Sequence, residues 1–283
     1  MSIIVTAATG QLGRLVVPSL LSRGVDPDRI VATGRSTDRL AGFADRGVRV
    51  AELDYTKPAD DVISAGDTVL LISGSELGQR VDQHRNVIEL AQSAGAARIV
   101  YTSLLRADST TLPIAPEHVA TEEILAASGV PHTILRNGWY SENYQQTFAQ
   151  AAQSGVVISS AGDGRVSGAT RADFAEAAAA VLTGDGHDGA VYELAGDTGF
   201  TMRELADTFA AVLGRPVELQ DLTSEEHHAV LVGAGLDDPT AGFLVALDRH
   251  TADGELYAEA GDLSRLIGRP TTPLADTVAA WNA

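Results

Sequence analysis

Residues 3–13 read IIVTAATGQLG, and this stretch decides the fold. A short β-branched run leads directly into small residues spaced A-x-x-G-x-x-G, and residues 12–22 continue with a helical pattern. Such a turn lets the backbone approach a pyrophosphate, which then faces the helix N-terminus. An ordinary glycine-bearing turn is the alternative. The residues expected to contact a dinucleotide are Ala7, Thr9, Gly10, Gln11, Leu12 and Gly13, with alanine where glycine is usual at the first position.

The rest of the first half repeats the alternation of strand and helix. Apolar runs predict strands at 30–33, 48–53, 69–73, 99–103 and 133–135, and helical patterns occupy 79–94 and 117–128. Continuous apolar strands joined by helices indicate a doubly wound parallel α/β sheet covered on both faces. We expect a nucleotide-binding domain over 1–150, rejoined by part of 165–200. A smaller α+β lobe is expected over 151–283, with a cleft between the two.

Composition excludes several classes of protein. The chain has 283 residues, no cysteine and a net charge of −18, so thiol chemistry is absent and neither nucleic acid nor an anionic membrane is an expected partner. No apolar run is long enough to span a bilayer, and the N-terminus lacks a basic signal region. These features predict a cytoplasmic protein. His227 and His228 are adjacent on a predicted helix and diverge by about 100°, so we expect no metal site.

The end of the second predicted strand indicates which dinucleotide would bind. Enzymes that use NAD usually place an acid there to bind the ribose 2′-hydroxyl, whereas an arginine nearby accommodates the 2′-phosphate of NADP. Here the sequence is ATGRS (32–36), so Arg35 favours NADPH over NADH. The alternative is that Arg35 is a solvated surface residue.

The single lysine limits the chemistry. Many short-chain dehydrogenases use a Tyr-x-x-x-Lys pair, in which the lysine lowers the pKa of the tyrosine that donates a proton. Lys57 is the only lysine, and its nearest upstream tyrosine is Tyr55, two residues away. The pair is therefore missing, and hydride transfer to an acceptor with a stable product anion remains, or binding without catalysis.

Several stretches together are more specific. TSLLRAD (102–108), RNGWYSENY (136–144) and ATRAD (169–173) resemble the NmrA-like branch of atypical short-chain dehydrogenases/reductases, most closely its bacterial type 2 NAD(P)H:quinone oxidoreductases. GQR (78–80), HRNVI (84–88), YELAGD (192–197) and LIGRPTT (266–272) also match, and the likeness is weakest near 223–259. The resemblance implies an extended Rossmann domain with a small C-terminal lobe, NADPH as cofactor and two-electron reduction of quinones.

The resemblance also implies positions for the remaining site residues. It places Ser73, Gly74 and Ser75 along the cofactor, Arg171 in a returning segment, and the nicotinamide end beside Asn137, Gly138, Trp139, Tyr140, Ser141 and Glu142. Aligning Glu122 with the helix glutamate of the superfamily puts His118 where the lysine usually stands, so His118 is expected to hold the nicotinamide ribose. A position on the helix surface is the alternative for His118.

An acceptor is expected beside the aromatic and amide cluster. Trp139, Tyr140 and Asn143 would line its site, with Tyr140 as a weakly supported proton donor. Packing in a core is the alternative for the two aromatic residues. Ser103 ends a predicted strand at the edge where ligands bind in such sheets, so it joins Tyr140, Asn137 and His118 as a catalytic candidate, or is a turn serine.

Three functions remain open. The first is an NADPH-dependent oxidoreductase that transfers a hydride to a quinone or a similar planar conjugated electrophile. The second is a redox sensor of the NmrA type that binds NADP(H) without turnover. The third is a reductase of another acceptor, such as an imine, an enone or a dye. The sequence also leaves open whether the chain forms a homodimer.

Overall fold

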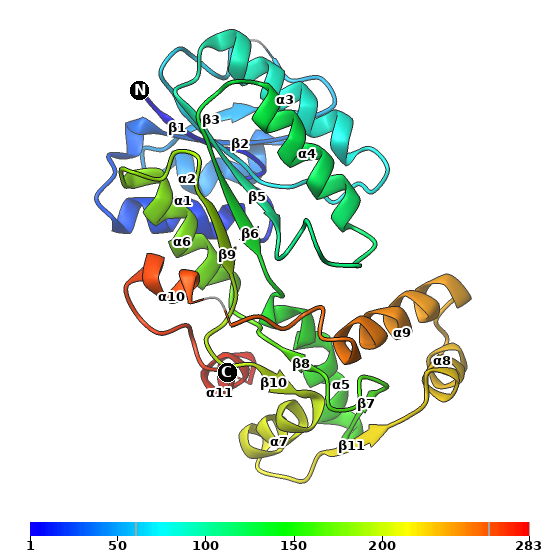
Figure 1. Ribbon diagram of the computed structural model, residues 1–283. Helices are drawn as coiled ribbons and strands as arrows, with labels where there is room; N and C mark the ends of the chain where they lie inside the picture. Colours follow the sequence, from blue (N-terminus) through cyan, green and yellow to red (C-terminus); the bar gives the residue numbers. More distant parts are fainter. Residues whose placement is uncertain (60, 260, 283) are drawn as a thin grey trace. The chain divides into compact units, whose positions relative to one another are not determined.

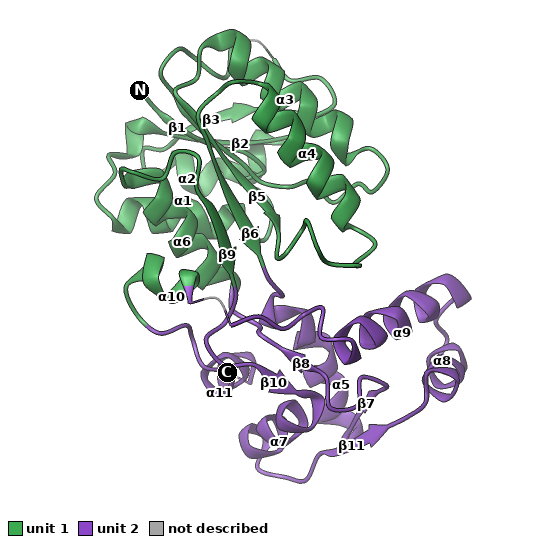
Figure 2. Ribbon diagram, viewed as in Figure 1, with its two compact units in different colours: residues 1–137, 171–194, 262–269 green, residues 138–170, 195–261, 270–283 purple. Residues whose placement is uncertain are grey.

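The computed structural model describes residues 1–59, 61–259 and 261–282, which form two compact units. Unit 1 contains residues 1–137, 171–194 and 262–269, and unit 2 contains residues 138–170, 195–261 and 270–283 (Figure 2). The first segment of unit 1 thus ends at Asn137 rather than near residue 150. The chain returns to unit 1 twice, and the second return, over 262–269, gives no signal in the sequence.

Unit 1 is built on one seven-stranded parallel sheet. Its strands are β1 (Ile3–Val5), β2 (Ile30–Gly34), β3 (Arg49–Glu52), β4 (Thr68–Leu71), β5 (Arg98–Leu104), β6 (His132–Asn137) and β9 (Val191–Leu194), in the order β3-β2-β1-β4-β5-β6-β9. Every pairing is parallel. The order reverses between β1 and β4, which is where ligands bind in such folds. The predicted doubly wound fold is confirmed.

Helices cover the sheet in two groups (Figure 1). Helices α1 (Gly13–Ser22) and α6 (Arg171–Thr183) pack together, as do α3 (Arg80–Ala94) and α4 (Ala115–Ala127). Shorter helices are α2 (Ala41–Ala44) and α10 (Asp262–Ile267), and one-turn 3₁₀ segments occur at Pro27–Arg29 and Thr37–Leu40. Since both faces are covered, β1 is buried at every position, which explains its unbroken apolar run.

Unit 2 combines helices with two small sheets. Strands β7 (Val156–Ser159) and β11 (Glu218–Asp221) pair in parallel, and β8 (Arg165–Val166) pairs with β10 (Phe200–Thr201) in antiparallel fashion. The helical segments are the 3₁₀ turn Ser141–Tyr144, α5 (Gln145–Ser154), α7 (Met202–Leu213), α8 (Ser224–Gly233), α9 (Asp238–Ala252) and α11 (Leu274–Trp281). Capping boxes begin α7 and α8, where Thr201 and Thr223 pair with Glu204 and Glu226.

Aromatic contacts form part of the core of unit 2. The ring centroid of Phe148 lies 5.1 Å from that of Phe209 and 5.9 Å from that of Trp281. These three rings join α5, α7 and α11, which are far apart in the sequence. Among the described residues, no helix is both long enough and apolar enough to cross a bilayer.

Candidate functional site

The turn after β1 packs tightly on the start of α1. The amide of Ala8 donates to the carbonyl of Thr33 at 2.7 Å, and the amide of Gly10 donates to the carbonyl of Ala7 at 2.9 Å. A Cβ atom on Gly13 would lie 2.4 Å from the oxygen of Ala7, closer than atoms can approach. Glycine at position 13 is therefore required by the packing of helix against turn.

The N-terminus of α1 is suited to an anion. Its first turn, residues 13–16, contains no acidic side chain, and among the described residues none caps the helix through its side chain. Gly10 and Gln11, which precede it, are exposed. Backbone amides at an uncapped helix start, on a turn of small residues, provide donors and a positive dipole end that fit a pyrophosphate.

Ala7 adopts a left-handed backbone conformation, with φ of +46°. A side chain there costs on the order of 1–2 kcal/mol, whereas glycine adopts this conformation freely. The alanine is thus accommodated with strain, and the turn keeps the shape of a glycine turn. The sequence shows the unusual residue but not the sign of its φ angle.

Replacing Ala7 with glycine is expected to stabilise the protein by about 1 kcal/mol, because relief of strain exceeds the added entropy of the unfolded chain. Urea unfolding of both proteins measures the difference. Ala8→Gly is the matched control, because Ala8 is fully buried and has no positive φ. This variant should be less stable than the parent. A less stable Ala7→Gly protein would contradict the assignment of strain.

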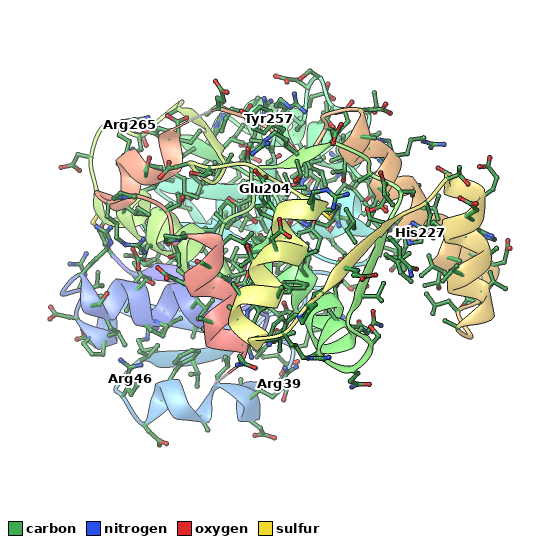
Figure 3. All side chains as sticks on the ribbon, turned by 90° about the horizontal axis from the view of Figure 1, so that it is seen from below. Arg39, Arg46, Glu204, His227, Tyr257 and Arg265 are labelled. Carbon is green, nitrogen blue, oxygen red and sulfur yellow. The ribbon has the colours of Figure 1, made fainter. Side chains whose placement is uncertain are left out.

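Two arginines lie near this turn. Arg35 follows β2, has an exposed side chain, and its Nη1 lies 3.0 Å from Oε1 of Glu76. Gly34, just before it, allows the close approach of Thr9, because a Cβ atom there would lie 2.9 Å from Thr9 Cγ2. Arg39, labelled in Figure 3, donates to the carbonyl of Thr9 at 3.4 Å. Arg39 was not among the residues predicted from the sequence, although a second arginine four residues after the first was a usable signal.

The loop after β4 is held from two helices. The amide of Gly74 donates to Nε2 of His84 at 2.9 Å, and Nε of Arg80 donates back to the carbonyl of Gly74 at 2.7 Å. At the far end of the loop, the amide of Gly78 donates to Oε1 of Glu117 at 2.6 Å. The loop that contains Ser73, Gly74 and Ser75 is therefore fixed by side chains of α3 and α4.

Two buried histidines in this network are neutral. Burial, reinforced by the nearby charge of Arg80, lowers the pKa of both His84 and His118 to about 3. His84 accepts at Nε2, so its Nδ1 carries the proton and donates to Thr121 at 3.0 Å. Each ring is thus held in a single tautomer.

His118 lies inside the protein, with only 4% of its surface exposed, so the alternative of a surface histidine is wrong. Its Nε2 accepts from Arg80 at 3.3 Å, and its Nδ1 donates to the hydroxyl of Tyr101 at 2.8 Å. Because both ring nitrogens are engaged with protein groups, this arrangement favours a positioning role over the expected direct contact with a ribose.

Ser103 belongs to a second network, centred on the buried Arg136. The Ser103 hydroxyl donates to Oε1 of Glu122 at 2.5 Å. Arg136 on β6 pairs with Glu122 through two hydrogen bonds of 2.7 and 3.0 Å, and its Nη1 lies 2.8 Å from both Glu193 and Asp108. The hydrogen bonds with Glu122, more than the other two carboxylates, raise the pKa of Arg136. The network joins α4, β6, β9 and the loop after β5.

The segment from Gly138 to Tyr144 belongs to unit 2, whereas Asn137 ends β6 in unit 1 and is buried there. The amide of Ser141 donates to the carbonyl of Ala169 at 2.9 Å, and the amide of Ala169 donates to the carbonyl of Trp139 at 3.1 Å. The two hydrogen bonds flank an isolated parallel bridge between Tyr140 and Ala169, and they hold the backbone from Trp139 to Ser141. Trp139 and Tyr140 are half-buried and Asn143 is exposed.

The predicted site residues thus fall in both units. Unit 1 brings together the turn of residues 7–13, Arg35 and the loop containing Ser73, and it also contains Ser103, His118, Asn137 and Arg171, the first residue of α6. Unit 2 contains the residues from Gly138 to Asn143. Their roles toward a cofactor or an acceptor remain predictions.

A histidine, an aspartate and two serines meet in unit 2, but not as a nucleophilic triad. Nδ1 of His227, labelled on α8 in Figure 3, lies 3.0 Å from Ser160 Oγ and 3.2 Å from Asp248 Oδ2. A triad requires the serine and the aspartate on different ring nitrogens. His228 instead faces Asp238 at 3.4 Å, so the two adjacent histidines diverge as expected.

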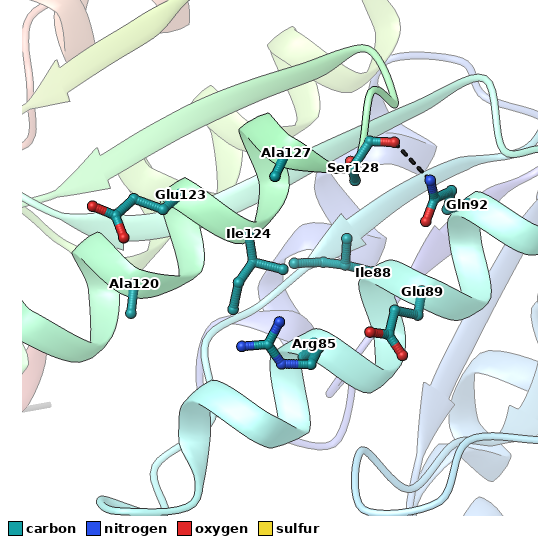
Figure 4. Close-up of a pocket in the computed structure, with 9 residues that line it drawn as sticks. All are labelled: Arg85, Ile88, Glu89, Gln92, Ala120, Glu123, Ile124, Ala127 and Ser128. Carbon is teal, nitrogen blue, oxygen red and sulfur yellow. Dashed lines mark hydrogen bonds between the residues drawn. The ribbon is translucent and has the colours of Figure 1, made fainter.

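A surface groove of about 410 Å³ runs between α3 and α4 (Figure 4). It contains none of the predicted site residues. Apolar residues of both helices form much of its lining, and charged residues lie among them. The lining residues are Arg85, Ile88, Glu89, Gln92, Ala120, Glu123, Ile124, Ala127 and Ser128.

Known proteins resemble this chain over nearly its full length. A family model described as NAD(P)H-binding matches residues 7–185. Quinone oxidoreductase 2 of Escherichia coli (strain K12) is 45% identical over 279 residues, which cover 98% of this chain and 97% of that protein. An NmrA-like family domain-containing oxidoreductase of Aspergillus flavus is 28% identical over 98% of this chain and 94% of its own length.

Solved structures extend the likeness to the fold. An NADPH-dependent quinone oxidoreductase of Escherichia coli in complex with NADPH has a TM-score of 0.92 and 44% identity, and covers 99% of this chain and 100% of its own. The triphenylmethane reductase of Citrobacter sp. complexed with NADP(H) has a TM-score of 0.93 and 35% identity, with the same coverage of both chains.

Proposed function

This chain belongs to the NAD(P)H-binding family, in its NmrA-like branch, and from that membership we propose an NADPH-dependent oxidoreductase that transfers a hydride to a quinone or a similar planar conjugated electrophile. The 45% identity with a quinone oxidoreductase over almost the entire chain carries this proposal. The fold and the geometry of the turn after β1 agree with it.

The residues of unit 1 fit the cofactor. The uncapped start of α1 and the turn of Ala7, Thr9, Gly10, Gln11, Leu12 and Gly13 would hold the pyrophosphate. Arg35 would bind the 2′-phosphate, and Arg39 is close enough to the same turn to assist it. The clamped loop of Ser73, Gly74 and Ser75 would lie along the cofactor, with Arg171 in the returning segment. NADPH, when bound, supplies the hydride.

Catalysis then depends on positioning more than on proton transfer. The phenolate of a reduced quinone is stabilised by resonance and can take its proton from water, so a Tyr–Lys pair is not needed. Trp139, Tyr140 and Asn143 would orient a flat acceptor, and Asn137, Gly138, Ser141 and Glu142 would line the nicotinamide end. His118 and Ser103 would act by fixing the strand ends that carry this site.

The proposed role of Arg35 in selecting NADPH over NADH can be tested directly. Arg35→Ala is expected to raise the KM for NADPH about tenfold or more, since a charge-assisted phosphate contact is lost, and to leave the KM for NADH within about twofold. Initial rates with a small quinone panel measure both. Arg46→Ala, on the same unit, is the control. Equal losses with both dinucleotides would show that Arg35 does not read the 2′-phosphate.

Reduction of another acceptor, or NADP(H) binding without hydride transfer, stays as a competing function. The structural match to a triphenylmethane reductase favours a dye or another extended cation as an alternative acceptor. A redox sensor of the NmrA type would bind NADPH tightly but would not oxidise it with any acceptor in the panel. Binding and turnover therefore have to be measured on the same preparation.

We also propose that the protein works in the cytoplasm as a homodimer, on a small-molecule substrate and with neither nucleic acid nor membrane as partner. The charge of −18 supports the last point. The groove between α3 and α4 exposes Arg85, Glu89 and Glu123, which carry both charge signs, around the half-buried Ile124, and this suits a self-complementary contact (Figure 4). Light scattering of the protein and of Ile124→Glu would show whether a dimer forms there.

A further inference from the structure

Glu76 lies on the loop after β4 and already occupies the guanidinium of Arg35. Its Oε1 is 3.0 Å from Arg35 Nη1, and its Oε2 accepts from Nε2 of Gln83 at 2.7 Å. Each carboxylate oxygen therefore has its own partner, one on α3 and one at the end of β2. Gln83 is 7% exposed and thus ordered by packing, so the carboxylate is held toward Arg35 from a fixed point.

The loop that carries Glu76 is itself fixed. Gly74 is bonded through both its amide and its carbonyl, to His84 and Arg80, and the amide of Gly78 is bonded to Glu117. Glu76 lies between these anchors. The backbone cannot carry the carboxylate far from Arg35 without breaking these hydrogen bonds, so release of the arginine requires rotation of the Glu76 or the Arg35 side chain.

The two groups that compete for Arg35 have the same charge sign. A 2′-phosphate that approaches the guanidinium has to replace the carboxylate, and it also meets the repulsion of a negative group a few ångströms away. A ligand that carries a 2′-hydroxyl instead makes no such exchange. The carboxylate of Glu76 is therefore expected to weaken the binding of ligands with a 2′-phosphate and not of those with a 2′-hydroxyl.

We propose that Glu76 is a built-in competitor for the 2′-phosphate, and that by occupying Arg35 it lowers the affinity for NADPH and its preference over NADH. The inference rests on the proposed function, because it requires Arg35 to bind the 2′-phosphate. Glu76 is a specificity-determining residue in this account, and Gln83 is the positioning residue that keeps it in place.

Calorimetric titration with adenosine 2′,5′-bisphosphate and with 5′-AMP tests this without any turnover. The two probes differ only in the 2′-phosphate. Glu76→Gln is expected to bind the bisphosphate about two- to fivefold more tightly than the parent, the range set by an exposed ion pair, and 5′-AMP with less than twofold change. Glu89→Gln, which removes the same charge from α3 on the groove side, should change neither.

The same titrations in an Arg35→Ala background separate competition from a general effect of charge. There the Glu76→Gln substitution should change bisphosphate affinity by less than twofold, because the contested guanidinium is gone. An equal gain with and without Arg35, or an equal gain for both probes, overturns the inference. Failure of the parent protein to bind NADPH would instead remove the proposed function itself, and this inference with it.

Discussion

Arg136→Met is expected to lower the free energy of unfolding by about 3–5 kcal/mol, because it leaves the nearly buried Glu122 and two more exposed carboxylates without their counter-ion. Arg136 is 7% exposed and is the shared partner of Glu122, Glu193 and Asp108. Methionine matches much of its length but supplies no charge. The carboxylates of Glu122 and Glu193, whose side chains are 12% and 31% exposed, would then repel each other near the ends of β6 and β9.

Urea unfolding followed by circular dichroism measures this loss. Arg265→Met is the matched control, because Arg265 has an exposed side chain, 62% accessible, paired with Asp262 one helical turn away. Its loss should cost no more than about 1 kcal/mol. Arg136→Lys keeps the charge but not the paired hydrogen bonds, so its stability should lie between those of the parent and the methionine variant. It provides the measurement if the methionine variant does not fold. Similar stability of Arg136→Met and Arg265→Met would contradict the assigned role.

Acidification from pH 7 to pH 4 is expected to remove several kcal/mol of stability, because of the two buried histidines. The folded state holds the pKa of His84 and of His118 at about 3, whereas an unfolded histidine titrates near 6.5. Between these values the unfolded chain binds more protons than the folded one. Stability is therefore complete above about pH 6.5 and falls as the pH decreases toward 3, with each histidine contributing about 1.4 kcal/mol per pH unit.

His84→Gln separates this effect from the titration of carboxylates. A glutamine can still accept from the amide of Gly74 and donate to Thr121, but it does not bind a proton. The free energy of unfolding is measured at half-unit steps from pH 4 to pH 6.5. Its loss on acidification should be smaller in the variant than in the parent, by about 1.4 kcal/mol per pH unit. An unchanged slope would mean that His84 is not held neutral by the fold.

The turn after β1 and the parallel sheet could be predicted from the sequence because both depend on local patterns. Small residues between an apolar run and a helical pattern suffice for the first, and repeated buried strands suffice for the second. Helices α5 and α9 were not predicted, and Gln145–Ser154 is rich in glutamine and alanine. Their positions depend on packing within unit 2.

The environment of the site residues could not be predicted, because it arises from distant segments. His118 is on a helix whose sequence does not show that Tyr101 and Arg80 meet both of its ring nitrogens. Arg136 stands out in the sequence only as part of a motif, since its partners come from α4, β9 and the loop after β5. Glu76 had no sequence signal at all, because its pairing with Arg35 spans 41 residues.

The most direct test of the proposed function is anaerobic mixing of the purified protein with NADPH and a simple quinone, with the reduced nicotinamide and the quinone followed together by absorbance. The account predicts that one NADPH is oxidised for each quinone reduced and that the reaction needs no further cofactor. It also predicts that NADH supports the reaction at a much higher KM. Tight binding of NADPH without its oxidation, with any quinone of the panel, would contradict the assignment as a quinone reductase.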